Sequence, residues 1–533
     1  MKWFSLLLVL CTASIANSIK FCPLRGPSWP VPTGLSTDPT VKSALQNITT
    51  TIQQAISAGN LSSNSISLQI FDANDPDALF TLLRTAAEID TTIGVSQVDE
   101  NTIFRIGSTS KDPISQYIPE LNQAANDLFG NSTKWDDGID FTKWNEVTIG
   151  ELASHMAGIA RSYAVLDLTE QAPMVERLGF PVLPESQVPT CGAPNPCNRK
   201  QFFKGLVQSR PIFPTSSTPV YSNAAFQILG YALEAMTSKD FQNVLAYDLL
   251  KPLNLSRTFY NTPDISLGVV PSSGGQQFWN FAMGDDAGGI YSSAKDMATF
   301  GRAILNSTLV PPGITRRWMK PAAHTASLGY DFGAPWEILS VGKQRPIDLY
   351  TKSGEIGVYS SGLALSVDHG VGFTILSAGN NSHSSVALAS DLISAILIPA
   401  LEQSAKNQAH ERFAGTYSLD NGPGLVVTNW INNSSNMFHA FMALNGMSDP
   451  SQLRIRLYPT GLESPGRISF RAVVPPALPS GTGPFTSSCF TWVTVDSHVY
   501  GNVGIDEFVF NLDQKGNVES ISPRALHTTL QKA

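Results

Sequence analysis

The sequence predicts an α+β fold followed by an all-β domain, and three observations lead to that prediction. Apolar residues recur at helical spacing in three segments, residues 40–58, 223–236 and 386–401. Strand patterns occur in three others, residues 65–71, 363–366 and 372–376. The last two strands flank the turn Asp368-His369-Gly370, which indicates an antiparallel pair. Beyond residue 405 only short strand-like runs remain.

Local residues mark two helix starts. Thr148 and Glu151 form a capping box, because the threonine hydroxyl can accept from first-turn N–H groups while the glutamate reaches back. This helix is predicted to continue to Gly158. The helix that begins at Asn223 carries its apolar residues on one face, so Tyr221 is expected just before its N-terminus.

The C-terminal segment is predicted to be a small β sandwich or barrel. Six runs of strand composition are separated by turn-rich segments: residues 425–431, 438–444, 453–458, 468–474, 490–495 and 508–512. The chain is therefore divided into a processing signal (residues 1–16), an α+β domain (residues 17–405) and a small β-rich domain (residues 406–533).

Composition excludes several classes of function. The chain has 533 residues, of which 42% are hydrophobic and 15% are charged, as in folded globular proteins. Its formal net charge of −8 has the wrong sign for a protein that follows phosphate backbones, so nucleic acid is not an expected partner. The sequence contains no G-x-x-x-x-G-K-[ST] loop, no CxxC pair and no HExxH helix, so neither a cofactor nor a metal is expected.

The N-terminus has the pattern of a secretory signal peptide. Lys2 precedes an apolar run at residues 3–10, and Ser14 and Ala16 are the small residues that a signal peptidase needs. A buried N-terminal helix is the alternative. No later apolar run is expected to reach the roughly 18 residues that a membrane span requires, since residues 392–401 are too few. The mature chain is expected to be secreted.

Sequons and cysteines agree with export. Eight asparagines begin an N-x-[ST] motif: Asn47, Asn60, Asn131, Asn254, Asn306, Asn380, Asn432 and Asn433. After removal of the signal, four cysteines remain, an even number suited to disulfides: Cys22, Cys191, Cys197 and Cys489. A short turn-forming loop separates Cys191 from Cys197, and this favours their pairing, which leaves Cys22 for Cys489. Four cysteines allow three connectivities.

Three short motifs carry the candidate chemistry. The elbow G-x-S-x-G is absent, but Ser108 and Lys111 form an S-x-x-K motif, which on a helix places the amine one turn from the hydroxyl. S-x-x-K recurs at residues 292–295 and 340–343, and the Y-x-N motif of residues 221–223 recurs at residues 500–502. The third motif, Lys352-Ser353-Gly354, occurs once.

In this order the three motifs resemble those of the serine β-lactamase and penicillin-binding protein superfamily, and the Y-x-N version resembles class C β-lactamases. Flanking segments strengthen the resemblance: residues 104–108, 147–159, 287–297 and 354–360. The resemblance implies a β-lactamase/transpeptidase-like α+β fold, with an antiparallel sheet flanked by helices. Residues 412–417 are similar to the opening of a lipocalin-like C-terminal domain in some members.

The resemblance implies a role for each motif residue. Ser108 would be the nucleophile that forms an acyl-enzyme, activated by Lys111 and Tyr221. Asn223 would orient Lys111 and the substrate, and Lys352 would stabilise charge near Tyr221. Ser353 and Gly354 would let the strand approach the substrate, and the N–H groups of Ser108 and Glu355 would form the oxyanion hole. The expected partner is then a small-molecule ester or amide. Glu355 departs from the small residue that many members carry there.

One departure from the family lies directly after the S-x-x-K motif. Asp112 and Pro113 follow Lys111 at once, and a proline moves the preceding residue out of the helical region. The long apolar helix of the family has no room there, and its loss should leave a cavity between helices and sheet. The chain therefore lacks a segment or is a degenerate member. Three functions stay open: a secreted serine hydrolase, an acyltransferase of secondary metabolism, and a catalytically impaired binding glycoprotein.

Overall fold

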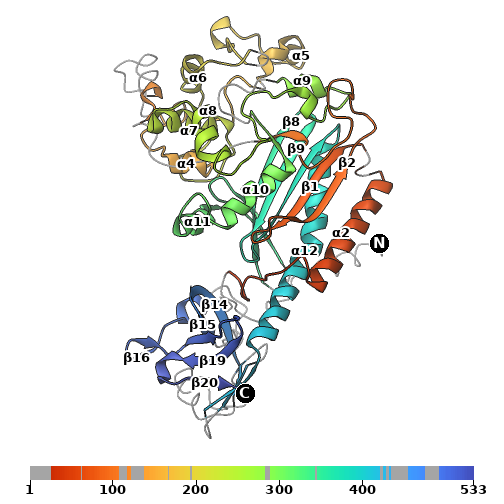
Figure 1. The fold of residues 1–533 in the computed structure, drawn as a ribbon. Helices are drawn as coiled ribbons and strands as arrows, with labels where there is room; N and C mark the ends of the chain where they lie inside the picture. Colours follow the sequence, from red (N-terminus) through yellow and green to blue (C-terminus); the bar gives the residue numbers. More distant parts are fainter. Residues whose placement is uncertain are drawn as a thin grey trace, which may run out of the picture. The chain divides into compact units, whose positions relative to one another are not determined.

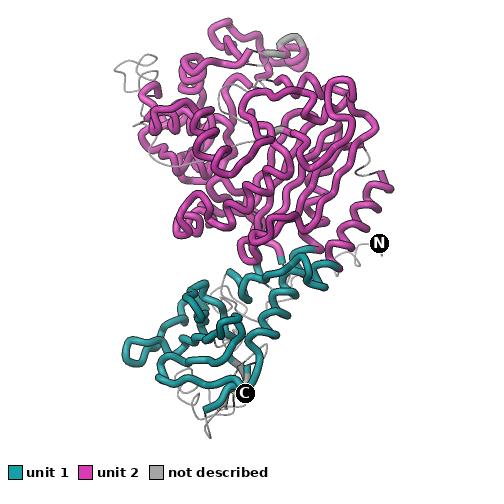
Figure 2. The backbone as a smooth tube through the Cα atoms, in the orientation of Figure 1, with its two compact units in different colours: residues 1–42, 342–347, 397–533 teal, residues 43–341, 348–396 magenta. Residues whose placement is uncertain are grey.

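The structure is a computed structural model and describes residues 26–59, 61, 63–106, 117–121, 137–165, 167–192, 195–281, 289–342, 345–419, 424–427, 431–433, 454–473 and 491–533. Two compact units divide the chain (Figure 2). The sheet unit contains residues 43–341 and 348–396, and the barrel unit contains residues 1–42, 342–347 and 397–533. The barrel unit thus takes in two short segments besides the β-rich C-terminal part of the chain.

An eight-stranded sheet with the order β2-β1-β10-β9-β8-β7-β6-β5 forms the centre of the sheet unit (Figure 1). Its strands are β1 (Ser65–Asp72), β2 (Ala78–Arg84), β5 (Ala323–His324), β6 (Tyr330–Phe332), β7 (Glu337–Val341), β8 (Ile347–Ile356), β9 (Tyr359–Ser366) and β10 (Val371–Ala378). The predicted strand pair is confirmed, because β9 and β10 are antiparallel, with Ser366 opposite Val371. Two further strands, β3 (Ile103–Ile106) and β4 (Ile290–Ser293), pair separately.

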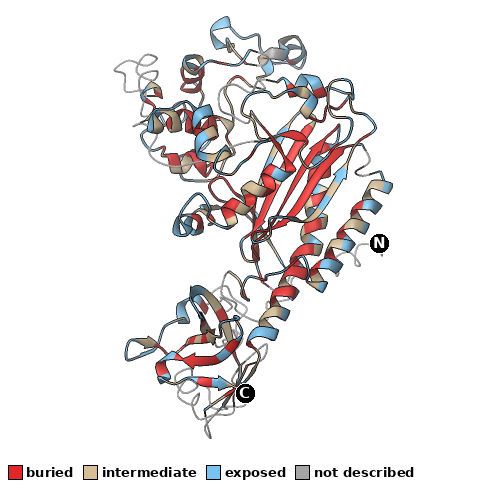
Figure 3. Ribbon diagram, in the orientation of Figure 1, coloured by how far each residue is buried: buried red, intermediate tan, exposed pale blue. Residues whose placement is uncertain are grey.

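Helices cover both faces of the sheet. A Cβ atom on Gly301 of α10 (Ala294–Leu305) would contact Leu365, whereas one on Gly362 would contact Val386 of α12 (Ser382–Phe413). Leu365 and Gly362 are three positions apart on β9, so they point to opposite faces. All residues of β1 and β10 are consequently buried, and the central strands are red in Figure 3. The sequence indicated apolar–polar alternation in β1, but Ser67 and Gln69 are buried as well.

The sheet unit has more than one apolar core: one includes Trp144, Phe203 and Ile228, and two others include Trp279 of α9 and Trp318 of α11. Its helices include α4 (Ile149–Ala153), η3 (Leu168–Gln171), α5 (Ala172–Arg177), η4 (Glu185–Gln187), α6 (Arg199–Leu206), α7 (Asn223–Thr237), α8 (Phe241–Val244), η5 (Leu245–Leu250), η6 (Ile265–Leu267), α9 (Gly275–Trp279) and α11 (Pro312–Trp318). Both hydrogen bonds of the predicted capping box are present in α4. The predicted extension of α4 to Gly158 is wrong, because His155 and Gly158 have positive φ angles of 59° and 67°.

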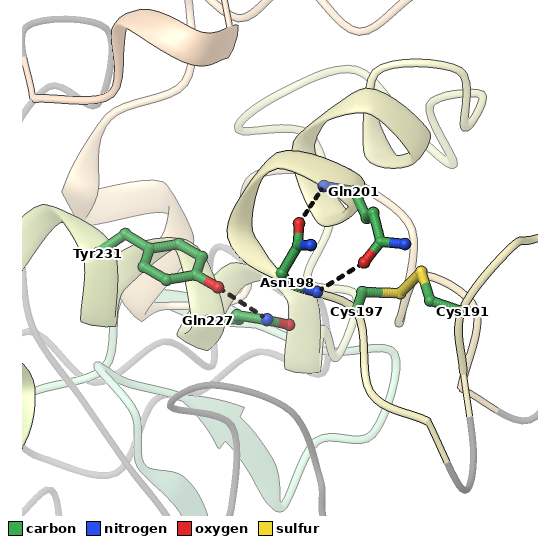
Figure 4. Close-up of a disulfide and its surroundings, with 6 residues drawn as sticks. All are labelled: Cys191, Cys197, Asn198, Gln201, Gln227 and Tyr231. Carbon is green, nitrogen blue, oxygen red and sulfur yellow. Dashed lines mark hydrogen bonds between the residues drawn. A yellow bond between two sulfur atoms is a disulfide. The ribbon is translucent and has the colours of Figure 1, made fainter.

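Cys191 and Cys197 form a disulfide beside the start of α6 (Figure 4). Asn198 and Gln201 follow as a second capping box, in which each side chain accepts the other residue's backbone N–H. Cys22 and Cys489 lie outside the described residues.

A closed barrel, β11-β12-β13-β14-β15-β18-β19-β20, makes up most of the described C-terminal part. Its strands are β11 (Gly415–Ser418), β12 (Gly424–Val427), β13 (Ile431–Asn433), β14 (Arg454–Ser464), β15 (Arg467–Val473), β18 (Glu507–Leu512), β19 (Val518–Pro523) and β20 (Leu530–Lys532). The remaining elements are β16 (Val499–Tyr500), β17 (Val503–Gly504), α14 (Thr491–Thr494) and η9 (Arg524–Leu526). Phe413, Phe470 and Phe510 pack edge-to-face inside the barrel.

Four of the six predicted C-terminal strands overlap with β12, β14, β15 and β18, and residues 438–444 lie outside the described residues. The strand predicted at residues 490–495 is wrong, because α14 occupies residues 491–494. Trp492 and Val493 are 74% and 53% exposed there, so they do not serve as inward strand residues.

Two long helices lie at the N- and C-terminal ends of the sheet unit in sequence, and both extend into residues of the barrel unit. α2 (Pro39–Ser57) matches the helix predicted at residues 40–58. α12 is longer than the predicted residues 386–401, and an 18-residue window within it has a mean hydropathy of 1.8, with 39% of the window buried. By length and composition alone this helix could cross a membrane, which corrects the expectation that no run is long enough. Core helices of soluble proteins meet the same criterion.

Candidate active site

The structure describes six of the eight residues that the motifs predict for the site: Tyr221, Asn223, Lys352, Ser353, Gly354 and Glu355. Ser108 and Lys111 lie outside the described residues. In the sequence, β3 ends two residues before Ser108. Their predicted roles therefore stay predictions.

Tyr221 lies at the start of α7, as predicted. Ser222 is the N-cap and its hydroxyl accepts the N–H of Ala225, which fixes the backbone next to the tyrosine. The Lys352 ammonium lies 5.3 Å from the centroid of the Tyr221 ring, and the Arg161 guanidinium lies 5.0 Å from it. Two motifs that are far apart in the sequence are thus brought together, with two cations beside one aromatic ring.

His155 stacks on Tyr221, with ring centroids 4.6 Å apart. Its side chain is buried, and its Nδ1 accepts the backbone N–H of Ser222 at 3.2 Å. Within the described part of the chain its Nε2 has no hydrogen-bond partner. Burial, and then the charge of Lys352, lower the pKa of His155 to about 3, so the ring is neutral at physiological pH. The ring therefore supports Tyr221 by packing and carries no charge.

Asn223 is the first residue of α7 and faces the loop that follows α4. Its Nδ2 donates to the Ser162 hydroxyl at 3.2 Å, and its N–H donates to the Arg161 carbonyl at 2.7 Å. These contacts hold the start of α7 against the segment that also supplies Arg161.

Lys352 on β8 is paired with Glu337, the first residue of β7. The Lys352 Nζ is 2.8 Å from Glu337 Oε1, and the two side chains are only 17% and 12% exposed. Glu337 Oε2 accepts both the N–H and the hydroxyl of Ser353, at 3.2 Å and 2.8 Å. The lysine also donates to the Ser353 carbonyl at 2.7 Å. The sequence analysis missed Glu337, because no motif contains it and only the adjacency of β7 and β8 places it there.

Gly354 and Glu355 continue β8 towards its end, opposite Ser361 and Ser360 of β9. A Cβ atom on Gly354 would lie 3.0 Å from the Ser361 hydroxyl, so a side chain fits poorly there. Glu355 is half exposed and forms an ion pair with His383 of α12. Its carboxylate thus faces solvent while its backbone stays in the sheet.

A cavity of about 290 Å³ lies behind this strand end, between α7, α8, η5, α10 and the sheet. Most of its wall is apolar, and the polar wall residues include Lys352, Ser353 and Asp296. The wall residues are Leu233, Phe241, Val244, Leu245, Asp248, Leu249, Leu255, Thr258, Ile290, Ser292, Asp296, Met297, Phe300, Trp318, Pro335, Trp336, Lys352, Ser353, Ser361 and Leu363. Burial raises the pKa of Asp296 despite hydrogen bonds from Thr258 and Arg257.

Among the described residues, no three histidine, cysteine, aspartate or glutamate side chains are grouped to hold a metal ion. The site that the structure does describe consists of Lys352 on β8, which lines the apolar cavity, and Tyr221 before α7, whose ring lies beside the Lys352 ammonium.

Two families match the chain. The family described as "Beta-lactamase" matches residues 76–397, and the family described as "Beta-lactamase-like-like, C-terminal domain" matches residues 405–533. The beta-lactamase-like protein of Arthroderma benhamiae is 28% identical, over 96% of this chain and 95% of that protein. The probable hydrolase M10 of a Phoma species is 22% identical, over 95% of this chain and 91% of that protein. Among solved structures, a class C beta-lactamase is 15% identical with a TM-score of 0.44, over 66% of this chain and 96% of that chain.

The Arthroderma alignment is longer than this chain. It extends over 585 residues, whereas the chain has 533, so at least 52 aligned positions have no residue of this chain. The first family match covers more than half of the chain and contains Ser108, Tyr221 and Lys352. The chain belongs to the beta-lactamase family and carries the C-terminal domain of its beta-lactamase-like members.

Proposed function

We propose that this chain is a secreted serine hydrolase that cleaves a small-molecule ester or amide of secondary metabolism through an acyl-enzyme on Ser108. One observation carries the proposal: in a chain of a hydrolase family, the Lys352 ammonium lies 5.3 Å from the centroid of the Tyr221 ring. Tyrosine is one of the side chains that enzymes use for general acid–base proton transfer.

In the proposed reaction, the Ser108 oxygen attacks the carbonyl carbon while its proton passes to Tyr221, assisted by Lys111. Tyr221 then gives this proton to the leaving alcohol or amine as the C–O or C–N bond breaks. Water repeats the sequence and releases the acid, with its proton returned through the same residues. The N–H groups of Ser108 and Glu355 would bind the oxyanion in both steps.

Secretion is part of the proposal, and exposed sequons support it. Asn47, Asn254, Asn306 and Asn380 are exposed, as glycan attachment requires. The Asn306 Nδ2 also donates to the Ala73 carbonyl at 2.6 Å, so this site is the least accessible of the four. Asn60 and Asn131 lie outside the described residues, and the side chains of Asn432 and Asn433 are not described.

A catalytically impaired binding glycoprotein is the second candidate. It is supported by the sequence Lys111-Asp112-Pro113 and by the 52 or more aligned positions that this chain lacks. The apolar cavity beside Lys352 would then bind a ligand without turning it over.

Labelling with a fluorophosphonate separates the two candidates. Intact mass of the secreted, deglycosylated protein should show one adduct in the wild type and none in Ser108→Ala. Ser340→Ala is the matched control, because Ser340 also begins an S-x-x-K motif but its hydroxyl is bonded to Asp348 at 2.7 Å. No adduct on folded protein would favour the binding glycoprotein. If esters are cleaved, transfer of the acyl group to an added alcohol in place of water would identify an acyltransferase.

A further inference from the structure

The donors at the end of β8 already bind a carboxylate of the protein itself. An ammonium, a serine hydroxyl and a backbone N–H within one strand make a ready site for an anion. Here Lys352 and Ser353 direct all three groups at Glu337, at distances of 2.8, 2.8 and 3.2 Å. A substrate carboxylate would have to displace this internal one.

Burial makes that displacement costly. Glu337 and Lys352 are 12% and 17% exposed, so water screens their charges little, and an unpaired Glu337 would lose most of its solvation. The Lys352 ammonium has three N–H groups, of which one donates to Glu337 and one to the Ser353 carbonyl. Only the third remains for a substrate. The backbone of Glu337 is also fixed, because the Thr351 hydroxyl donates to the Glu337 carbonyl.

The surrounding charges do not restore a positive field. Arg161 is exposed, so solvent screens its charge, and Glu355, three positions after Lys352 on β8, adds a second carboxylate to this strand beside His383. The negative charge of Glu337 also acts on the Tyr330 phenol: burial, and then the Glu337 charge, raise the pKa of Tyr330 to about 12. The cavity wall beyond Lys352 is mostly apolar.

We propose that Glu337 is a specificity-determining residue, which makes this site select substrates whose acyl group is apolar and carries no carboxylate. The inference rests on the proposed hydrolase function and names its substrate class. Lys352 and Ser353 line the cavity, so a neutral chain can enter it without disturbing their contacts with Glu337. A carboxylate that binds these donors would have to compete with the Glu337 carboxylate for them in a poorly solvated setting.

Two para-nitrophenyl esters of equal chain length test the proposal. The valerate ester ends in a methyl group and the glutarate monoester ends in a carboxylate. Wild-type kcat/KM should favour the valerate ester by roughly 10- to 100-fold, as expected for like charges in a partly desolvated site. Glu337→Gln keeps the size and can still accept from Ser353, and it should reduce this preference at least tenfold. Glu100→Gln, which removes the partner of Lys295, changes net charge equally and should leave the preference unchanged.

A binding measurement keeps the test independent of turnover. Calorimetry with valeranilide and with glutaranilic acid should show binding of the neutral anilide to wild type and of both compounds to Glu337→Gln. Equal use of the two esters by wild type, or a preference unchanged in Glu337→Gln, would overturn the proposal and leave the hydrolase function standing. If neither ester is cleaved, the hydrolase function fails. Calorimetry then decides the specificity: a preference for the neutral anilide supports it, and equal or absent binding overturns it. The wild-type arms apply even if Glu337→Gln does not fold.

Discussion

The space behind β8 and the inside of the C-terminal barrel are built from similar apolar residues but differ in how they are filled. The first contains a cavity of about 290 Å³ with an ion-paired lysine in its wall. In the described part of the barrel, the rings of Phe413, Phe470 and Phe510 pack together with their centroids 4.8–5.2 Å apart. A filled interior contributes stability, whereas an open one next to polar groups can take a ligand.

Two tyrosines show the same contrast. The Tyr221 ring lies beside Lys352, Arg161 and His155. The Tyr417 hydroxyl donates to the Phe413 carbonyl at 2.7 Å inside the barrel, and burial raises the pKa of this phenol. We propose proton transfer for the first phenol, whereas the second satisfies a carbonyl at the end of a helix.

Removing each hydroxyl should give opposite results, and this is the largest effect we expect. Tyr221→Phe should lower kcat by roughly 10²- to 10⁴-fold, as for loss of a general base, with little change in stability. Tyr417→Phe should leave kcat unchanged and lower the free energy of unfolding by about 1–3 kcal/mol, because the buried Phe413 carbonyl loses its donor. Ester hydrolysis and urea unfolding of both variants measure this. Normal activity in Tyr221→Phe would contradict the proposed proton transfer.

Matched leucine truncations compare the two interiors directly. Leu530 is fully buried in the barrel, and Leu363 is 4% exposed in the cavity wall. Leu530→Ala should cost roughly 4–5 kcal/mol and Leu363→Ala roughly 2–3 kcal/mol, because Leu363 has fewer neighbours to lose on the cavity side. Urea unfolding midpoints and slopes of both variants measure the difference. Equal costs would mean that the cavity is closed by rearrangement in solution.

The sequence predicted what depends on local pattern and missed what depends on strand adjacency. The start of α7 at Asn223 and the capping box at Thr148 were predictable, because capping and periodicity act within a few residues. The pairing of Glu337 with Lys352 was not, since it requires β7 to lie beside β8. Residues 490–495 have strand composition yet contain α14, whose Trp492 faces solvent.

The pH dependence of the free energy of unfolding tests the burial of His155. Unfolded His155 has the ordinary pKa of 6.5, whereas the folded value is about 3, so between these values only the unfolded state binds the proton. Stability is therefore full above pH 6.5 and falls as the pH drops towards 3. Between pH 7.5 and pH 5 the loss should be about 2 kcal/mol.

The control for this loss is His155→Asn, which tolerates the positive φ of this position, offers an acceptor to the Ser222 N–H and does not titrate. Urea unfolding at both pH values should show the loss in wild type and about 2 kcal/mol less of it in the variant. An identical pH dependence in the two proteins would show that His155 is protonated in the folded state.

The smallest effect we expect has opposite signs in the two interiors. Val244→Leu adds a methylene to the cavity wall and should raise the free energy of unfolding by about 0.8 kcal/mol, because the space is there to receive it. Val427→Leu makes the same change in the barrel core and should lower it by about 1–3 kcal/mol through overpacking. Thermal unfolding of the two variants gives the signs. If both destabilise, the cavity wall is as tightly packed in solution as the barrel. If Val244→Leu stabilises the protein and also lowers kcat/KM for the valerate ester, the acyl chain occupies the space that the added methylene fills.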